Sequence, residues 1–310
     1  MIRVAKRVVR HMLNTIGYDI VARQSDDYVY GHVPYNPNTV PIEVYERHYP
    51  ADSIRNRRFY NVGAGTFRHP YWTNIDYASD WYAKAQTGGD MINFDLFSLG
   101  QLPIEDASAE VVYTSHTVEH VNDPAVMNMM KEAWRILKPG GVFRMTTPNI
   151  DLDLRAYRSG DRDHFYYLGL YSHPSVIANA SLDPQRPFLS ASLQQLVLFS
   201  FASSTTVLVA DKTSEKITDE EFDHVFSTMS DENALNHCVS KCSRDVQSKY
   251  PGYHMNWWNP EKATRMLRAA GFSNVYQSAY GQSASPILRD VTLFDVQDPK
   301  LSLYVEAVKS

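Results

Sequence analysis

Short apolar runs bounded by turn residues alternate with a helical pattern along much of the chain. Phe59–Val62 is one such run and ends at two glycines one residue apart, and a second run ends at Asp76. Runs of this kind are typical of buried strands in a parallel sheet. Glu110–Ser115 and Val142–Thr146 are expected to be further strands, with apolar residues at helical spacing over residues 123–137 between them. The pattern predicts an α/β fold.

The two glycines and the acid after them predict a nucleoside site. Gly63 and Gly65 allow a sharp turn off the first strand and a close approach of the backbone to a ligand. Asp76 can accept hydrogen bonds from both hydroxyls of a ribose. It follows Gly63 by only thirteen residues, and Phe67 stands where a dinucleotide site has a further glycine. Because this leaves a poor pyrophosphate cradle, S-adenosylmethionine (SAM) fits the stretch better than a nicotinamide dinucleotide.

A long segment separates the two halves of the predicted core. Residues 151–255 are too long for a linker and too apolar and aromatic for disorder. We interpret them as an inserted, mostly helical cap that shapes the pocket for the second substrate. Residues 256–310 return to the core, with a helix starting at Asn259-Pro260 and strands expected over residues 274–280 and 301–308.

Residues 1–58 precede the first predicted strand. Residues 2–17 have apolar residues on one helical stripe and several Arg and Lys residues elsewhere. Such a helix docks on its own protein, forms an oligomer contact or lies in a membrane interface. Residues 24–58 are rich in Tyr, Pro, Asn and His, with one short helix expected over residues 42–49. We interpret them as an irregular lead-in that either covers the open edge of the nucleoside pocket or serves as a structural wrap.

The composition of the chain argues against several classes of protein. A formal net charge of −5 argues against a general nucleic-acid binder, which needs a basic surface. No apolar run reaches the ~20 residues of a membrane span, and the N-terminus has no signal-peptide core. Cys238 and Cys242 are expected to be free thiols, although with His237 they could form half of a metal site. We expect a cytoplasmic protein, with peripheral contact at the inner face of the membrane as the alternative.

Three blocks in order resemble the class I SAM-dependent methyltransferases, in the methyltransferase type 11-like branch. They are NVGAG…WTNID over residues 61–76, LPIEDAS…SHTVEH over residues 102–120 and LKPGG over residues 137–141. Two departures affect single SAM contacts: Asn61 stands where the family usually has an acid, and Phe67 where it often has its last glycine.

The resemblance implies a Rossmann-like seven-stranded sheet formed by residues 59–150 and 256–310. It also implies SAM as methyl donor and S-adenosylhomocysteine (SAH) as product. An acid near residue 95 would bond the adenine amino group and the next apolar residue would pack on the ring, and Ser115 and His116 should emerge beside the sulfonium. The implied cofactor-binding residues are Gly63, Ala64, Gly65, Asp76, Tyr77, Asp95, Leu96, Ser115 and His116.

Methyl transfer mainly requires an acceptor aligned with the methyl carbon. A hydroxyl acceptor also benefits from a general base, and histidine suits that role. His116 is the first candidate because it follows the central strand. His120 and His173 are further candidates, and Glu119 beside His120 could cap or orient. Each of these residues also has a structural alternative.

Aromatic faces together with His and Asn donors suit a sugar or another polyhydroxylated ring. The candidate substrate-binding residues are Asn149, Arg155, His164, Tyr167, His254 and Trp257. Asp151 and Asp153 could hold a divalent metal beside vicinal hydroxyls, but a metal is not favoured.

The sequence thus predicts a SAM-dependent methyltransferase that is O-directed and acts on a sugar or glycan precursor of surface-polysaccharide biosynthesis. The alternatives are an N- or O-methyltransferase of a small secondary metabolite and a catalytically inactive SAM-binding partner subunit. A nicotinamide-dependent reductase is disfavoured by the short spacing between Gly63 and Asp76. A homo-oligomer remains open, and no nucleic-acid partner is expected.

Overall fold

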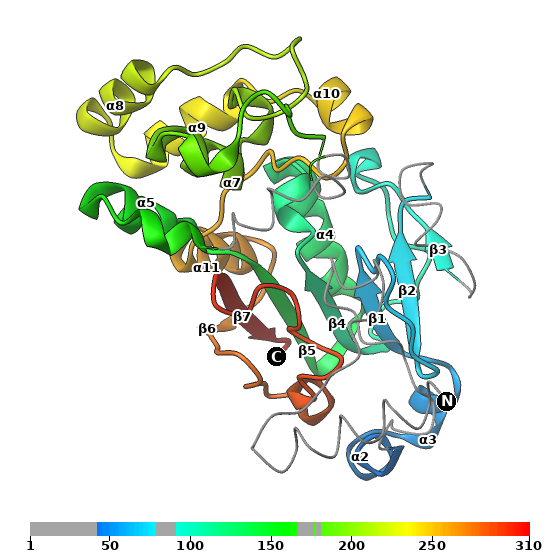
Figure 1. Cartoon of the computed structure of the whole chain (residues 1–310). Coiled ribbons are helices and arrows are strands. Elements are labelled where there is room, and N and C mark those ends of the chain that lie inside the picture. The colour runs from blue at the N-terminus through cyan, green and yellow to red at the C-terminus, as the bar shows by residue number, and fades with distance from the viewer. Residues whose placement is uncertain (1–41, 79–90, 167–176, 178–180) are drawn as a thin grey trace, which may run out of the picture. The chain divides into compact units, whose positions relative to one another are not determined.

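The computed structural model describes residues 42–78, 91–166, 177 and 181–310 (Figure 1). All of them belong to the second of two compact units, Val33–Ser310, whereas the first unit, Met1–His32, lies outside the described residues. The helix predicted over residues 2–17 and the lead-in over residues 24–41 therefore also lie outside them.

A seven-stranded sheet forms the centre of the described unit (Figure 1). Its strand order is β3-β2-β1-β4-β5-β7-β6, and only β7 runs antiparallel to its neighbours. This is the strand order of the class I methyltransferase sheet, so the predicted α/β fold is confirmed. The strands are β1 (Phe59–Val62), β2 (Trp72–Asp76), β3 (Met91–Asn93), β4 (Ala109–Ser115), β5 (Leu137–Pro148), β6 (Asn274–Gln277) and β7 (Ser302–Val308).

The chain order reverses at β1. Phe59 pairs with Trp72 in β2 on one side and with Val111 in β4 on the other. All four residues of β1 are buried, as expected of a central parallel strand covered on both faces. Because β1, β2 and β4 are parallel, their carboxyl ends lie at one edge of the sheet, where open α/β sheets bind ligands.

Helices α4 (Asp123–Ile136) and α11 (Pro260–Ala269) pack on one face of the sheet and share a hydrophobic cluster with β4, β5 and β7. Asn259 caps α11 as predicted, since its side chain accepts a hydrogen bond from the Lys262 N–H. The cap of α4 is Asn122, one residue before the predicted Asp123, and it accepts from the Ala125 N–H.

The opposite face is covered by α2 (Ile42–His48), α3 (Ala51–Arg55) and η7 (Pro286–Arg289). Tyr45 of α2 packs on Phe59, and its hydroxyl accepts a hydrogen bond from Trp72 Nε1 at 2.7 Å. Phe59 and Trp72 are the first residues of their strands. The described part of the lead-in thus contacts the amino end of the sheet, and the expectation that it covers the nucleoside edge is wrong for these residues.

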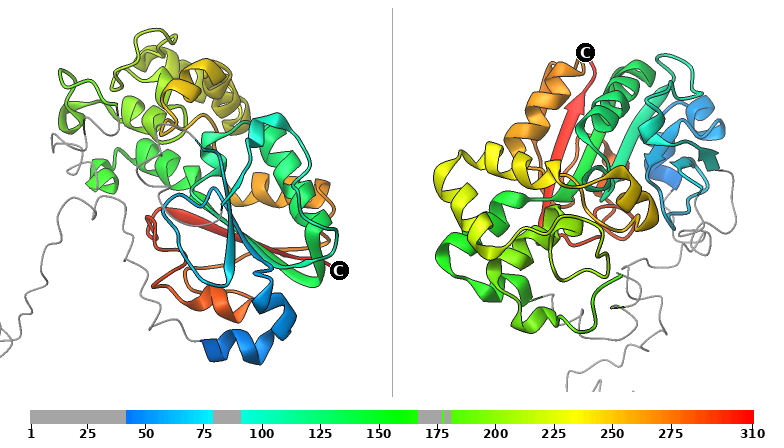
Figure 2. Two further views of the ribbon diagram at one scale, coloured as in Figure 1. Left: turned by 90° about the vertical axis from the view of Figure 1, so that its right-hand side faces the viewer. Right: turned by 90° about the horizontal axis from the view of Figure 1, so that it is seen from above.

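The segment predicted to be a cap is largely helical where the structure describes it. Its helices share a hydrophobic cluster of their own that runs from Ile150 to Trp257, and the arrowheads of β1 and β2 point towards them (Figures 1 and 2). The domain bounds stay a prediction, and this cluster is the observation in their favour. The elements are α5 (Ile150–Ser159), η5 (Phe188–Ser190), α7 (Leu193–Phe201), η6 (Ser203–Thr205), α8 (Asp219–Thr228), α9 (Asp231–Ser240) and α10 (Arg244–Lys249).

Two expectations from composition can be compared with the structure. Cys238 and Cys242 are free thiols, and burial raises the pKa of Cys238 to about 12. His237 instead pairs with Glu221 at 3.0 Å. In the described part of the chain, no helix has both the length and the apolar character that a bilayer crossing demands.

A buried arginine ties the last strands to the connection before β7. Arg144 in β5 pairs with Asp295 and with Glu306, and all three side chains are fully buried. The guanidinium also donates hydrogen bonds to the carbonyls of Ala279 and Gln282. A buried ion pair is stable only when its donors and charges are matched in this way.

Replacing Arg144 by Met should therefore leave the buried carboxylates of Asp295 and Glu306 without their cationic partner. We expect the free energy of unfolding to fall by about 3–5 kcal/mol, measured by chemical denaturation. The matched control is Arg158→Met, whose pair with Asp231 is at the surface and should contribute less than about 1 kcal/mol. Similar losses in the two variants would contradict the role given to Arg144.

Candidate active site

The loop after β1 is held against the loop after β4. Gly63 and Gly65 have φ of +70° and +51°, a backbone region that favours glycine. A Cβ atom on Gly63 would lie 2.1 Å from Oγ1 of Thr117, which follows β4. Only glycine fits at position 63, and the buried Ala64 continues the same turn. The two loops meet where the strand order reverses, as the sequence predicts for a ligand edge.

Asp76 stands at the end of β2 beside this glycine loop. One carboxylate oxygen, Oδ2, accepts a hydrogen bond from the Gly65 N–H at 2.7 Å, and Oδ1 accepts one from the Tyr77 N–H at 2.7 Å. A carboxylate has about four lone-pair positions, so it can hold the loop and also accept from a ribose hydroxyl. The side chain is half-buried, and Tyr77 next to it is exposed. This geometry fits the predicted nucleoside edge.

Asp95 and Leu96, predicted to contact the adenine, lie at η2 (Leu96–Ser98). Oδ1 of Asp95 caps this turn by accepting from the Phe97 N–H, and Oδ2 pairs with Arg244 of α10 at 3.0 Å. The Arg244 guanidinium also lies over the Phe97 ring. The cap thus contacts the predicted adenine loop through a residue that the sequence analysis did not single out.

Ser115 ends β4 and His116 follows it, as predicted, but their side chains point into the protein. The Ser115 hydroxyl lies 2.8 Å from Thr146 Oγ1. His116 has φ of +49°, and its side chain is only 4% exposed. Its Nε2 lies 2.8 Å from Ser302 Oγ and its Nδ1 lies 3.2 Å from Glu119. Since both ring nitrogens are engaged in the interior, the structure does not favour His116 as the base that meets an acceptor.

Glu119 is a buried carboxylate in η3 (Val118–His120). Its Oε2 accepts a hydrogen bond from Thr147 Oγ1 at 3.1 Å, whereas Oε1 has no hydrogen-bond donor in good geometry among the described residues. Burial raises the pKa of this carboxyl, but the close approach of His116, whose Nδ1 lies 3.2 Å from Oε1, outweighs burial and holds the pKa at about 2. Glu119 is therefore ionised at neutral pH.

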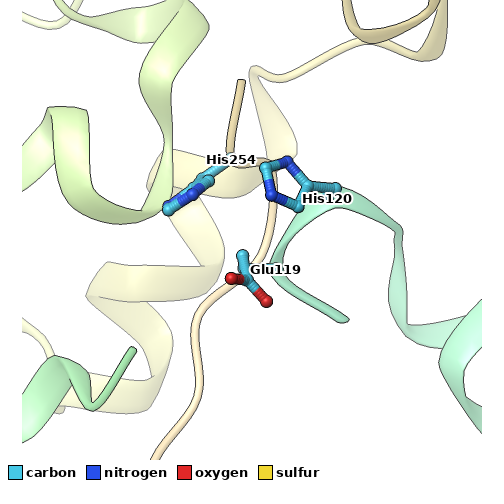
Figure 3. A group of neighbouring side chains, drawn as sticks. All are labelled: Glu119, His120 and His254. Atoms are coloured by element: carbon cyan, nitrogen blue, oxygen red, sulfur yellow. The ribbon is translucent and has the colours of Figure 1, made fainter. Parts of the chain in front are cut away.

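His120 and His254 lie beside this carboxylate (Figure 3). Their rings meet edge to face with centroids 4.7 Å apart. The Nδ1 atom of His120 lies 3.1 Å from the Tyr253 carbonyl, and that of His254 lies 2.6 Å from the Ser200 carbonyl. A carbonyl oxygen only accepts, so each Nδ1 carries the proton. Burial, aided by the neighbouring His254, lowers the pKa of His120 to about 4, which leaves its ring neutral with a lone pair on Nε2.

Glu119, His120 and His254 each offer one ligand atom, and these atoms lie within 4.8 Å of one another. We call the three residues the Glu-His-His cluster. Sequence analysis named His120 as catalytic and His254 as substrate-binding but gave Glu119 only an orienting role. The adjacent Glu and His after the central strand were the available signal. Nothing in the sequence indicates that His254, near the end of the cap, would meet them.

Of the other predicted substrate-binding residues, those that the structure describes do not join this cluster. Asn149 caps α5 by accepting from the Asp151 N–H. Arg155 is exposed and lines an open groove of about 450 Å³ on α5. Trp257 is buried and donates from Nε1 to Asn236 at 2.9 Å. Tyr167 and the candidate base His173 lie outside the described residues.

The carboxylates considered for a metal point in different directions. Asp153 is buried, and its Oδ1 lies within hydrogen-bond distance of His164 Nε2, at 2.8 Å, so His164 contacts an internal carboxylate. Asp151 is exposed and accepts from Asn259 Nδ2. The two acids therefore do not form a shared metal site.

Comparison with known proteins agrees with this arrangement. Residues 64–145 match the family model described as a methyltransferase domain. A probable S-adenosylmethionine-dependent methyltransferase of Mycolicibacterium smegmatis is 35% identical over 75 residues, which are 24% of this chain and 28% of the relative. The chain thus spans under a third of that relative's length.

Solved structures of SAM-dependent methyltransferases also align with the chain. One from Archaeoglobus fulgidus is 12% identical, covers 86% of this chain and 98% of its own, and has a TM-score of 0.37. One from Mesorhizobium loti is 14% identical, covers 81% and 90%, and has a TM-score of 0.37. Scores of this size carry no argument, so the fold assignment rests on the strand order. From that order and the match over residues 64–145, the chain contains a class I SAM-dependent methyltransferase domain.

Proposed function

We propose that the protein transfers the methyl group of SAM to a hydroxyl of an acceptor bound under the cap. The observation that carries the proposal is the methyltransferase-domain match, which spans Gly65, Asp76 and the Glu119-His120 pair. These residues come from the loops after β1, β2 and β4, whose carboxyl ends lie at one edge of the sheet.

The glycine loop and Asp76 support a donor site without phosphate groups. Gly63 keeps the backbone close to Thr117, and the Asp76 carboxylate faces the Gly65 N–H. In this arrangement the ribose of SAM bonds Asp76, and its sulfonium lies beyond the end of β4. Methyl transfer from a sulfonium mainly requires that the acceptor oxygen lie about 3–3.5 Å from the methyl carbon.

The Glu-His-His cluster supports a hydroxyl acceptor. It follows β4 directly, and His120 and His254 are half-buried, so it lies close to where the methyl group would be presented. The neutral imidazole of His120 can take or orient a hydroxyl proton. A sugar or glycan precursor of surface-polysaccharide synthesis is the acceptor class we propose, since the half-buried imidazoles of His120 and His254 can form hydrogen bonds with the hydroxyls of a polyhydroxylated ring.

Removing the Asp76 carboxylate should weaken SAM binding. For Asp76→Ala we expect a loss of about 1–3 kcal/mol, or roughly 5- to 150-fold in Kd, because a buried ribose hydroxyl loses its acceptor. Isothermal titration calorimetry measures this directly. Glu46→Ala, an exposed position on α2, is the control and should bind as the native protein does. Unchanged affinity in Asp76→Ala would place the donor elsewhere.

Methyl transfer itself is tested with labelled SAM. The protein is incubated with nucleotide sugars, with lipid extracts that contain glycan precursors and with a pool of small metabolites, and SAH formation is followed. We expect label in a sugar-containing product. Label only in a small metabolite would overturn the acceptor class. SAM binding without SAH formation from any pool would identify a binding subunit rather than an enzyme.

A further inference from the structure

We propose that the Glu-His-His cluster binds one divalent transition-metal ion, with Zn²⁺ as the best-fitting ion, next to the methyl acceptor. Glu119, His120 and His254 are the ligands (Figure 3). The role of the ion in methyl transfer rests on the proposed function, whereas its binding does not.

The spacing of the three side chains suits one shared ion. One ligand atom from each lies within 4.8 Å of the other two. Zinc binds imidazole nitrogen and carboxylate oxygen at about 2.0–2.2 Å, so three such ligands around one ion lie roughly 3–4 Å apart. Small rotations of the side chains bring the cluster to that geometry.

The hydrogen bonds around the cluster engage one ring nitrogen of each histidine and leave the other available as a ligand. His120 and His254 each donate Nδ1–H to a backbone carbonyl, of Tyr253 and Ser200 respectively. The Nε2 atoms, which form no hydrogen bond with the described residues, then carry the lone pairs. Metal-ligating histidines almost always donate their other ring N–H to a carbonyl or carboxylate, which fixes the tautomer and the ring orientation.

A hydrogen bond also orients the third ligand, Glu119. Thr147 donates to Oε2 at 3.1 Å, and His116 Nδ1 lies 3.2 Å from Oε1 without good hydrogen-bond geometry. Oε1 therefore has a close ion-pair neighbour but no well-directed hydrogen-bond donor, which is costly for a buried carboxylate oxygen. An ion between Glu119 and the two histidines would satisfy this oxygen, whereas His116 would remain behind the carboxylate.

The ligand set selects the kind of ion. Mg²⁺ and Ca²⁺ prefer oxygen ligands, whereas two imidazoles and one carboxylate suit zinc and its neighbours in the first transition row. Three protein ligands with an open position are typical of catalytic zinc. Glu119 is buried but His120 and His254 are half-buried, so the open position lies on the side of the two imidazoles.

An acceptor hydroxyl at that position would be activated by the ion. A bound cation lowers the pKa of a hydroxyl, so its proton passes to solvent. The oxygen then forms a bond to the methyl carbon, and the electron pair of the breaking C–S bond goes to sulfur. The sulfonium becomes the neutral thioether of SAH, and the ion is not consumed.

Metal binding is tested on the full chain, without an affinity tag and stripped with a chelator. Zn²⁺ content is measured by plasma mass spectrometry and affinity by competition with a chromogenic chelator. We expect one tightly bound Zn²⁺ per chain. Glu119→Gln and His254→Ala should each bind at least about 100-fold more weakly, and Thr147→Val about 10- to 100-fold, the size of loss known when the support of a ligand is removed.

Two variants serve as controls. His224→Ala removes an exposed histidine of α8, and Cys242→Ser removes a thiol outside the cluster. Both should bind Zn²⁺ as the native chain does. Co²⁺ is a second probe: visible absorption without a thiolate band is expected. Zinc lost in Cys242→Ser, or retained at full affinity in His254→Ala, would overturn the proposal, as would a native chain that binds no Zn²⁺.

Circular dichroism verifies the fold of each variant. If His254→Ala fails to fold, the Co²⁺ spectrum of the native chain and the Zn²⁺ affinity of Thr147→Val show whether the cluster binds the ion. SAM binding is measured in the same samples. A chain that binds SAM and forms SAH but takes no Zn²⁺ contradicts only the metal site. A chain that binds Zn²⁺ at the cluster but never forms SAH contradicts the proposed function and leaves the metal site standing.

Discussion

The parallel pairing of β1 with β2 on one side and β4 on the other is the constraint on which the site depends. It brings the ends of three strands to one edge, so that Gly63 contacts Thr117 and Asp76 reaches the Gly65 N–H. None of these contacts is local in sequence. A change that separates β1 from β4 would remove the donor loop and the Glu-His-His cluster together, because both lie at the ends of these strands.

Much of the fold could be predicted because its signals are local. Apolar runs ended by glycine or acid located the first strands, and Asn-Pro located the start of α11. The predictions that differ from the structure concern which part of the sheet an element contacts and which way a side chain points. The pattern of residues 42–49 indicated a helix, and α2 is one, but a pattern does not show which end of the sheet a helix contacts. Tyr45 bonds to Trp72 at the start of β2 and so fixes α2 at the amino end.

The predicted and observed sites differ for the same reason: sequence position does not show which way a side chain points. Sequence position placed His116 at the end of β4, where a catalytic group is expected. Its positive φ turns the ring inward, towards Ser302 and Glu119. The neighbouring His120 instead meets His254, which lies near the end of the cap. A contact between residues so far apart in the chain leaves no periodicity or spacing in the sequence, so only the folded chain reveals the Glu-His-His cluster.

The central claim is that the donor lies across the ends of β1 and β2 with its sulfur facing the Glu-His-His cluster. A crystal structure with bound SAH tests this most directly. We expect both ribose hydroxyls within hydrogen-bond distance of the Asp76 carboxylate and the sulfur directed towards His120 and His254. SAH bound with its ribose away from Asp76, or with its sulfur pointing away from the two histidines, would contradict the account.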